Sequence, residues 1–224
     1  MIGIIPVAGN ATRMGGFLKF LLPIPNQNQT LISWHIENQL KICEKIIIAT
    51  KAENATLFKF LTKNEKVCVF IVETETMSET VIKVVNAFPS EEYVLGMPDT
   101  FCFGENPYDK LNNLNKNDIE VCLWNTENYQ IEKLGQVLID KNNKIIDVVD
   151  KNKNINYPFV WGIIKFKKSF IRFFNKELSH IGLSLMPAIN SGIVANGILI
   201  KGKYFDCGTI DEYNRLINHL YENI

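Results

Sequence analysis

The chain has 224 residues, 46% of them hydrophobic, and its 24 basic residues are balanced by 24 acidic ones. This length suits one α/β domain, and a formal net charge of +0 gives no electrostatic reason to expect nucleic acid or an anionic membrane as a partner. Small anionic ligands fit better. No apolar run approaches a membrane span of about 20 residues, and the N-terminal apolar run is too short for a signal peptide, so we expect a cytoplasmic protein.

The first element is an apolar strand that ends in a loop of small residues. The strand covers residues 2–7, and five short side chains follow it: Ala8, Gly9, Asn10, Ala11 and Thr12. Such residues let backbone N–H groups approach phosphate oxygens, and Arg13 and Lys19 add positive charge. Neither Gly-x-x-x-x-Gly-Lys-Ser/Thr nor Gly-x-Gly-x-x-Gly is present. The loop predicts a bound nucleoside triphosphate; an ordinary strand and loop with a surface Arg and Lys is the alternative.

Strand and helix patterns then alternate through the first half. Three β-branched runs predict strands: residues 45–49, 67–72 and 93–96. Apolar residues at helical spacing predict a helix over residues 31–40, and Thr76 with Glu79 forms a capping-box signature for a helix ending at Ala87. This alternation predicts a mostly parallel, Rossmann-like mixed sheet with helices on both faces and ligands at the carboxyl ends of its strands.

Later strands are separated by polar turns. Four further strands are predicted: residues 120–124, 135–139, 145–149 and 160–166. Residues 140–143 predict a hairpin, and two Asn-rich stretches, 111–116 and 151–156, predict loops. The second half, residues 118–224, is expected to extend the sheet of residues 1–117 within a single domain and to cover one side of the pocket.

The N-terminal loop resembles that of the sugar-1-phosphate nucleotidylyltransferase family. In that family a strand is followed by Ala-Gly-x-Gly-Thr-Arg-Leu/Met, then Pro-Lys and a Leu-Leu-Pro-Ile-like run; here Lys19 begins Lys-Phe-Leu-Leu-Pro-Ile. The chain departs at Ala11, where the family usually has Gly, and at Leu18, where it usually has Pro. The short gap from Arg13 to Lys19 is more similar to that of molybdopterin nucleotidyltransferases. The resemblance implies that Arg13 holds the leaving β- and γ-phosphates and that Lys19 stabilises charge at the α-phosphate.

Two aspartates match the metal ligands of this family. Asp99 ends Gly-Met-Pro-Asp, similar to the family's Gly-Asp, and Asp206 begins Asp-Cys-Gly-Thr, which resembles Trp-x-Asp-x-Gly-Thr. Mg²⁺ prefers oxygen ligands and takes one or two carboxylates with phosphate oxygens and water. The resemblance therefore implies that Asp99 and Asp206 hold Mg²⁺; a helix N-cap or turn is the alternative for Asp206.

The nucleobase would be read by the segment that carries Met77, Ser78 and Thr80. The family has Leu-Gly-Thr-Ala there, whereas this chain has Met-Ser-Glu-Thr, so the sequence does not indicate which nucleobase is bound. The segment 1–117 would thus be the nucleotide-binding half and 118–224 the sugar-phosphate-binding half.

Three motifs of the second half resemble the sugar-binding segments of the family. Asp150 and Lys151 resemble Glu-Lys, in which Lys binds the sugar phosphate and Glu a sugar hydroxyl. Gly135 lies in a segment similar to Tyr-Gly-Val-Val, and Trp161 and Gly162 in one similar to Thr-Gly-Ile/Leu-Tyr. An exposed turn is the alternative for Asp150, and a core position the alternative for Trp161.

The resemblance implies condensation of a nucleoside triphosphate with a sugar 1-phosphate to an NDP-sugar and pyrophosphate. Two alternatives stay open: a nucleotidyltransferase acting on a polyol phosphate, phosphocholine or a molybdopterin, and a non-catalytic nucleotide-binding protein. Many relatives self-associate, so a homo-oligomer is an open expectation. The isolated His35, His180 and His219 are expected on helices without catalytic roles, and five scattered cysteines are expected to be reduced and mostly buried.

Overall fold

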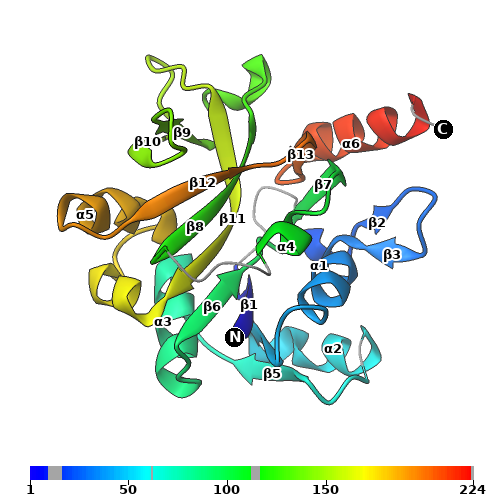
Figure 1. The fold of residues 1–224 in the computed structure, drawn as a ribbon. Helices are drawn as coiled ribbons and strands as arrows, with labels where there is room; N and C mark the ends of the chain where they lie inside the picture. The colour runs from blue at the N-terminus through cyan, green and yellow to red at the C-terminus, as the bar shows by residue number, and fades with distance from the viewer. Residues whose placement is uncertain (10–16, 62, 112–116, 223–224) are drawn as a thin grey trace.

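The computed structural model describes residues 1–9, 17–61, 63–111 and 117–222. Its central feature is one nine-stranded sheet that both halves of the chain build (Figure 1). The strands of this sheet are β1 (Ile2–Val7), β4 (Lys45–Thr50), β5 (Val67–Ile71), β6 (Glu92–Leu95), β8 (Ile119–Asn125), β9 (Gly135–Ile139), β10 (Ile145–Asp150), β11 (Phe159–Lys167) and β12 (Ala195–Leu199). Among the described residues, no helix has the length and apolar character needed to cross a membrane.

The sheet is mixed, as predicted. Its order is β10-β9-β11-β6-β1-β4-β5, and β8 pairs with β11 and with β12. β1 runs parallel to β4 and β6, and β4 runs parallel to β5. β11 runs antiparallel to β6, β8 and β9, so it joins the parallel first half to the second half. The carboxyl ends of β1, β4, β5 and β6 therefore meet at one edge, where such sheets bind ligands.

Helices cover both faces of the sheet. They are α1 (Leu31–Gln39), α2 (Ala55–Leu61), α3 (Met77–Ala87), α4 (Pro107–Lys110), α5 (Leu185–Asn190) and α6 (Ile210–Glu222). Ile5 belongs to a buried cluster that includes residues of α1, α2 and α6, whereas the adjacent Ile4 belongs to a second cluster with residues of α3 and α5. Successive strand residues point to opposite faces, so one Ile-rich strand supplies both cores. Figure 1 shows α1 and α2 on one side and α3 and α5 on the other.

Two short strand pairs lie outside the main sheet. β2 (Pro23–Ile24) pairs with β3 (Gln29–Thr30), and β7 (Thr100–Gly104) pairs antiparallel with β13 (Gly202–Asp206). Eight of the nine main-sheet strands lie where the hydrophobic patterns predict them, whereas β12 and the outlying strands β2, β3, β7 and β13 are additional findings. The short 3₁₀ helices are η2 (Lys19–Leu21), η3 (Ala52–Asn54), η5 (Asn128–Gln130), η6 (Lys168–Phe173) and η7 (Ile181–Ser184).

Two local predictions are confirmed by hydrogen bonds. The Thr76 hydroxyl caps α3 by accepting from Glu79 N at 3.0 Å, while the Glu79 carboxylate accepts from Glu75 N instead of closing the box on Thr76. In the hairpin, Asp140 Oδ1 accepts from the backbone at 142 and 144. The predicted loop over residues 151–156 is also found, but most of the loop predicted over residues 111–116 falls outside the described residues.

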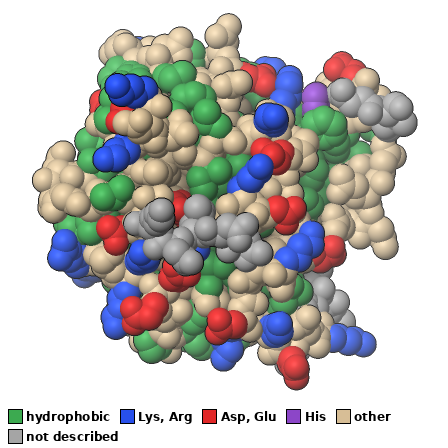
Figure 2. Space-filling model, viewed as in Figure 1, with side chains coloured by type: hydrophobic (Ala, Val, Ile, Leu, Met, Phe, Trp, Pro, Cys, Tyr) green, Lys and Arg blue, Asp and Glu red, His purple; other side chains and the backbone are tan. Residues whose placement is uncertain are grey.

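Charged side chains of both signs are interspersed over the face drawn in Figure 2. The five cysteines are free, and four of them are buried: Cys43, Cys102, Cys122 and Cys207. Burial raises the pKa of the Cys43 thiol to about 12 and also raises that of Cys102. These thiols behave as small apolar core side chains.

His35 is a buried polar residue of α1 that supports the strand after Asp99. Its Nδ1 accepts from the Tyr108 hydroxyl at 2.6 Å, and its Nε2 donates to the Thr100 carbonyl at 3.0 Å. The ring is fully buried, and burial lowers its pKa to about 4 despite the opposing bond to Thr100. His35 therefore has satisfied hydrogen bonds in the core, as expected.

Acid is expected to destabilise the protein through His35. In the unfolded state the His35 imidazole binds a proton below its ordinary pKa of 6.5, whereas in the folded state it binds one only below about pH 4. The free energy of unfolding should therefore fall as pH drops through this window, by up to about 3 kcal/mol. Urea unfolding at pH 7.5 and 4.5 measures the loss, and His35→Gln should lose less over the same window. An equal loss in both proteins contradicts the prediction.

Candidate functional site

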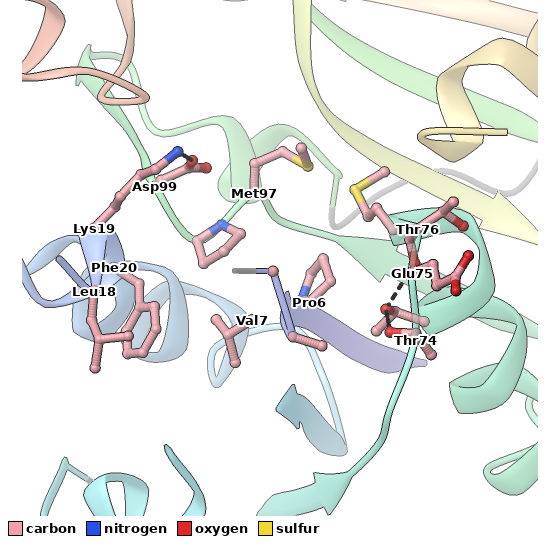
Figure 3. A pocket seen from close by; sticks show the side chains of 15 residues that line it. Pro6, Val7, Leu18, Lys19, Phe20, Thr74, Glu75, Thr76, Met97 and Asp99 are labelled. Atoms are coloured by element: carbon pink, nitrogen blue, oxygen red, sulfur yellow. Dashed lines mark hydrogen bonds and ion pairs between the residues drawn. The ribbon is translucent and has the colours of Figure 1, made fainter. Parts of the chain in front are cut away.

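A cavity of about 330 Å³ opens at the carboxyl ends of the parallel strands. Its described walls come from four segments: residues 6–9 at the end of β1, 18–20 at η2, 74–77 with 80 at the start of α3, and 97–99 after β6. Figure 3 shows Lys19 and Asp99 at one end and Thr74, Glu75 and Thr76 at the other. The structure thus brings together Ala8, Gly9 and Lys19 with residues from two other parts of the chain.

Among the described residues that line the cavity, Lys19 is the one with a positively charged side chain. It begins η2, where its side chain is only 11% exposed, and its Nζ lies 3.6 Å from Asp99 Oδ2. A mostly buried ammonium beside a small-residue loop is suited to bind a phosphate oxygen. Asn10, Ala11, Thr12 and Arg13 lie outside the described residues, so their predicted roles stay predictions.

Pairing of β7 with β13 brings the two predicted metal ligands to the same place. Asp206 lies opposite Thr100 in the strand register, and Cys207 N donates to Asp99 O at 2.8 Å. Burial and then the charges of Asp99 and Glu212 raise the pKa of Asp206 to about 7, against the opposing effects of Lys19 and a bond from Gly208 N. Asp206 ends a strand and does not cap a helix.

The donor set fits a hard divalent cation. Asp99 and Asp206 repel each other when both are ionised, and a dication between them removes that repulsion. Among the residues that the structure describes, no three His, Cys, Asp or Glu side chains are arranged to hold a metal. Two carboxylates leave the other positions to phosphate oxygens and water, as Mg²⁺ prefers.

Helix α3 presents its first turn to the cavity. Met77 and Thr80 line the wall, whereas Ser78 is completely buried on the core side of the helix. The hydroxyls of Thr74 and Thr80 form a hydrogen bond of 2.6 Å, and the Thr80 hydroxyl lies 3.1 Å from the carbonyl oxygen of Thr76, to which it donates. Sequence patterns did not assign Thr74, Glu75 or Thr76 to the site, although the helix-capping signature at Thr76 indicates where the wall begins.

The predicted residues of the second substrate form a separate cluster around β9, β10 and β11. Asp150 lies opposite Gly135 in the register, and a Cβ on Gly135 would lie 2.1 Å from Trp161 Nε1. The Trp161 indole therefore covers the Gly135 backbone. Lys151 follows Asp150 with a φ of 48°, a left-handed conformation that few non-glycine residues adopt.

Gly162 faces the other side of β11. A Cβ there would lie 2.3 Å from the Tyr204 ring, so its absence lets β11 pack against the strand that ends in Asp206. The predicted substrate contacts of Gly135, Asp150, Lys151, Trp161 and Gly162 stay predictions.

His180 is a neighbour of this cluster that sequence reasoning missed. The expectation that it lies on a helix is wrong: its backbone is extended, immediately before η7. Its Nε2 lies 3.3 Å from Asp150 Oδ2. No local pattern indicates this contact, because the two residues meet only through the fold.

The fold has solved relatives, although no family model and no curated protein matches the sequence. A UDP-glucose pyrophosphorylase complexed with UDP-glucose aligns over 100% of this chain and 99% of its own, with a TM-score of 0.82 and 19% identity. A candidate glucose-1-phosphate thymidylyltransferase from Bacillus anthracis aligns over 100% of this chain and 96% of its own, with a TM-score of 0.80 and 20% identity. The inositol-1-phosphate CTP transferase of T. maritima aligns over 100% of this chain and 97% of its own, with a TM-score of 0.77 and 14% identity. The predicted single-domain, Rossmann-like mixed-sheet fold is confirmed, and these solved proteins share it.

Proposed function

We propose that this chain is a nucleotidylyltransferase that condenses a nucleoside triphosphate with a sugar 1-phosphate, giving an NDP-sugar and pyrophosphate. The observation that carries the proposal is the convergence of Lys19, Asp99 and Asp206, from three distant segments, at the carboxyl ends of the strands. The fold supports it, since the solved neighbours include proteins named for this reaction class. A fold by itself does not secure an activity, so the proposal rests on the site geometry as well as on the fold.

In this reaction an oxygen of the acceptor's phosphate attacks the α-phosphorus of the triphosphate. A new P–O bond forms, the bond between the α-phosphorus and the bridging oxygen breaks, and that electron pair leaves with pyrophosphate. Lys19 would neutralise charge that grows on the α-phosphate, and Arg13 would bind the leaving phosphates. Such chemistry depends on positioning and charge neutralisation and needs no covalent nucleophile.

Asp99 and Asp206 would hold the Mg²⁺ ion, and Lys151 would bind the acceptor's phosphate. When bound, the ion would supply positive charge that links triphosphate and acceptor. Ala8 and Gly9 leave the backbone open to the triphosphate, and Met77 and Thr80 line the far wall for the nucleoside. The carboxylate of Asp150, next to Lys151, would accept a hydrogen bond from a hydroxyl of the acceptor.

The test is pyrophosphate release with Mg²⁺, crossing ATP, CTP, GTP, UTP and dTTP with sugar 1-phosphates, inositol 1-phosphate, other polyol phosphates and phosphocholine. Release that requires one base and one sugar 1-phosphate supports the proposal and identifies both substrates. Release only with a non-sugar phosphate keeps the nucleotidyl transfer but changes the acceptor. Tight binding of a triphosphate without release on any acceptor contradicts an enzymatic role.

Removal of divalent cations is expected to abolish turnover. With excess EDTA the Asp99 and Asp206 carboxylates repel each other and the triphosphate, so pyrophosphate release should fall to background. Added Mg²⁺ should restore it. Full activity in EDTA contradicts the assignment of these aspartates as metal ligands.

A further inference from the structure

The segment formed by residues 176–180 connects the two parts of the proposed site. The Thr76 hydroxyl donates to Lys176 O at 2.6 Å, and Met77 N donates to Ser179 O at 3.2 Å. Thr76 and Met77 line the cavity at the start of α3. The backbone just before His180 is therefore hydrogen-bonded to the wall that would contact the nucleoside.

His180 extends from this segment to the end of β10. Its Nε2 lies 3.3 Å from Asp150 Oδ2, and the two side chains are only 15% and 19% exposed. Burial alone raises the pKa of Asp150, but the hydrogen bond and charge of His180, with the charge of Lys151, hold it below its usual range. Asp150 is thus kept as a carboxylate that the imidazole can hold in place.

Packing fixes the His180 ring in this position. Its centroid lies 5.6 Å from that of Trp161, and a Cβ on Gly182 would lie 2.9 Å from His180 Nδ1 and 2.3 Å from Trp161 Cζ2. Glycine at 182 therefore leaves the space that the two rings occupy. His180 Nδ1 and Trp161 Nε1 are both buried and have no hydrogen-bond partner within the described residues. A buried polar atom without a partner is costly, which indicates that this cluster serves more than packing.

Lys151 depends on the residue that His180 holds. It directly follows Asp150, its φ of 48° is unfavourable for a non-glycine residue, and its backbone N donates to Leu134 O at 3.3 Å. Fixing the Asp150 carboxylate on one side and the backbone on the other keeps this turn in one conformation. Loss of either restraint frees the Lys151 ammonium to point elsewhere.

We propose that His180 is a positioning residue for the acceptor: by holding Asp150, it orients Lys151 toward the acceptor's phosphate and couples that turn to the first residues of α3. This inference rests on the proposed function, because it assigns Lys151 to the acceptor's phosphate. His180 itself acts through Asp150 and takes no part in bond making or breaking.

The test compares His180→Ala, His180→Gln and Asp150→Asn with the double variant His180→Ala/Asp150→Asn. We expect His180→Ala to raise the KM for the acceptor about tenfold or more, with kcat and the KM for the triphosphate changed less than about twofold. His180→Gln keeps a hydrogen-bond donor and should recover part of the loss. The acceptor KM of the double variant should be no higher than that of the more severe single variant, because both changes remove the same contact between His180 and Asp150.

Two controls separate positioning from general damage. Glu91→Gln removes an exposed ion pair with Lys168 and should leave every constant unchanged. Melting temperatures identify any variant that fails to fold. If His180→Ala fails to fold, the acceptor KM of His180→Gln is the deciding measurement. An unchanged acceptor KM in a folded His180→Gln and His180→Ala, with wild-type turnover intact, overturns this inference but not the proposed function.

A binding measurement covers the case in which no acceptor gives turnover. Trp161 fluorescence, isolated by subtracting the Trp161→Phe protein, is titrated with glucose 1-phosphate and with inorganic phosphate. Quenching that weakens about tenfold or more in His180→Ala supports the positioning role even if the proposed reaction fails. No quenching in the wild type, or equal quenching in both proteins, overturns it.

Discussion

Replacing Lys19 by Ala is expected to lower kcat about 100-fold to 1000-fold, with a smaller change in the KM for the triphosphate. The ammonium is almost enclosed and lies beside Asp99 at the end of the cavity, so it is preorganised for charge that develops on the α-phosphate. A charge that is already in place when the transition state forms stabilises it more than it stabilises the ground state. This loss corresponds to about 3 to 4 kcal/mol of transition-state stabilisation.

Lys19→Arg and Lys168→Ala are the informative companions. Arg keeps the charge but has a planar group that does not match a point contact, so a partial recovery is expected. Lys168 pairs with Glu91 at the surface, where ion pairs contribute little, and its removal should leave turnover unchanged. Wild-type kcat in a folded Lys19→Ala protein would remove Lys19 from the catalytic machinery.

Replacing Asp206 by Asn is expected to lower turnover by about two to three orders of magnitude and to raise the Mg²⁺ concentration needed for half-maximal rate. The change removes a negative charge from the pair that would hold the ion. At the same time it removes repulsion from Asp99 and Glu212, which together with burial holds the Asp206 pKa at about 7. In metal-free buffer at pH 8 the variant should therefore be at least as stable as the wild type.

This combination distinguishes a metal ligand from a structural aspartate. A structural residue would lose activity and melting temperature together, whereas a carboxylate kept for function loses activity alone. Asp211→Asn changes an exposed aspartate in the first turn of α6 and should leave turnover unchanged, with only a small loss of melting temperature because a carboxylate there favours the helix dipole. An unchanged Mg²⁺ requirement in Asp206→Asn contradicts the assignment.

Local patterns were sufficient for eight of the nine strands of the main sheet and for two helices, α1 and α3. Runs such as residues 2–7 and 46–49 are apolar at every position because each strand is covered on both faces, and this signal needs no knowledge of partners. The cap at Thr76 is equally local, because donor and acceptor are three residues apart. The fold that this chain shares with the solved nucleotidyltransferases was expected from short motifs that keep their order along the chain.

Only the tertiary structure decided which of the candidate residues meet. Asp99 and Asp206 come together through β7 and β13, two short strands whose pairing depends on register between distant segments. Ser78 is buried whereas Met77 and Thr80 line the cavity, because the rotation of α3 about its axis is set by packing against the sheet.

The sequence by itself determined eight strands of the main sheet, two helices, the fold class and the residue types available for phosphate and metal binding, because these depend on hydrophobic pattern and on neighbours within a few positions. The contact of His180 with Asp150, the cover of Trp161 over Gly135 and the approach of Lys19 to Asp99 were decided by the tertiary structure. Each depends on side chains from elements far apart in the chain, and their distances are set by the packing of the whole sheet and not by any local spacing.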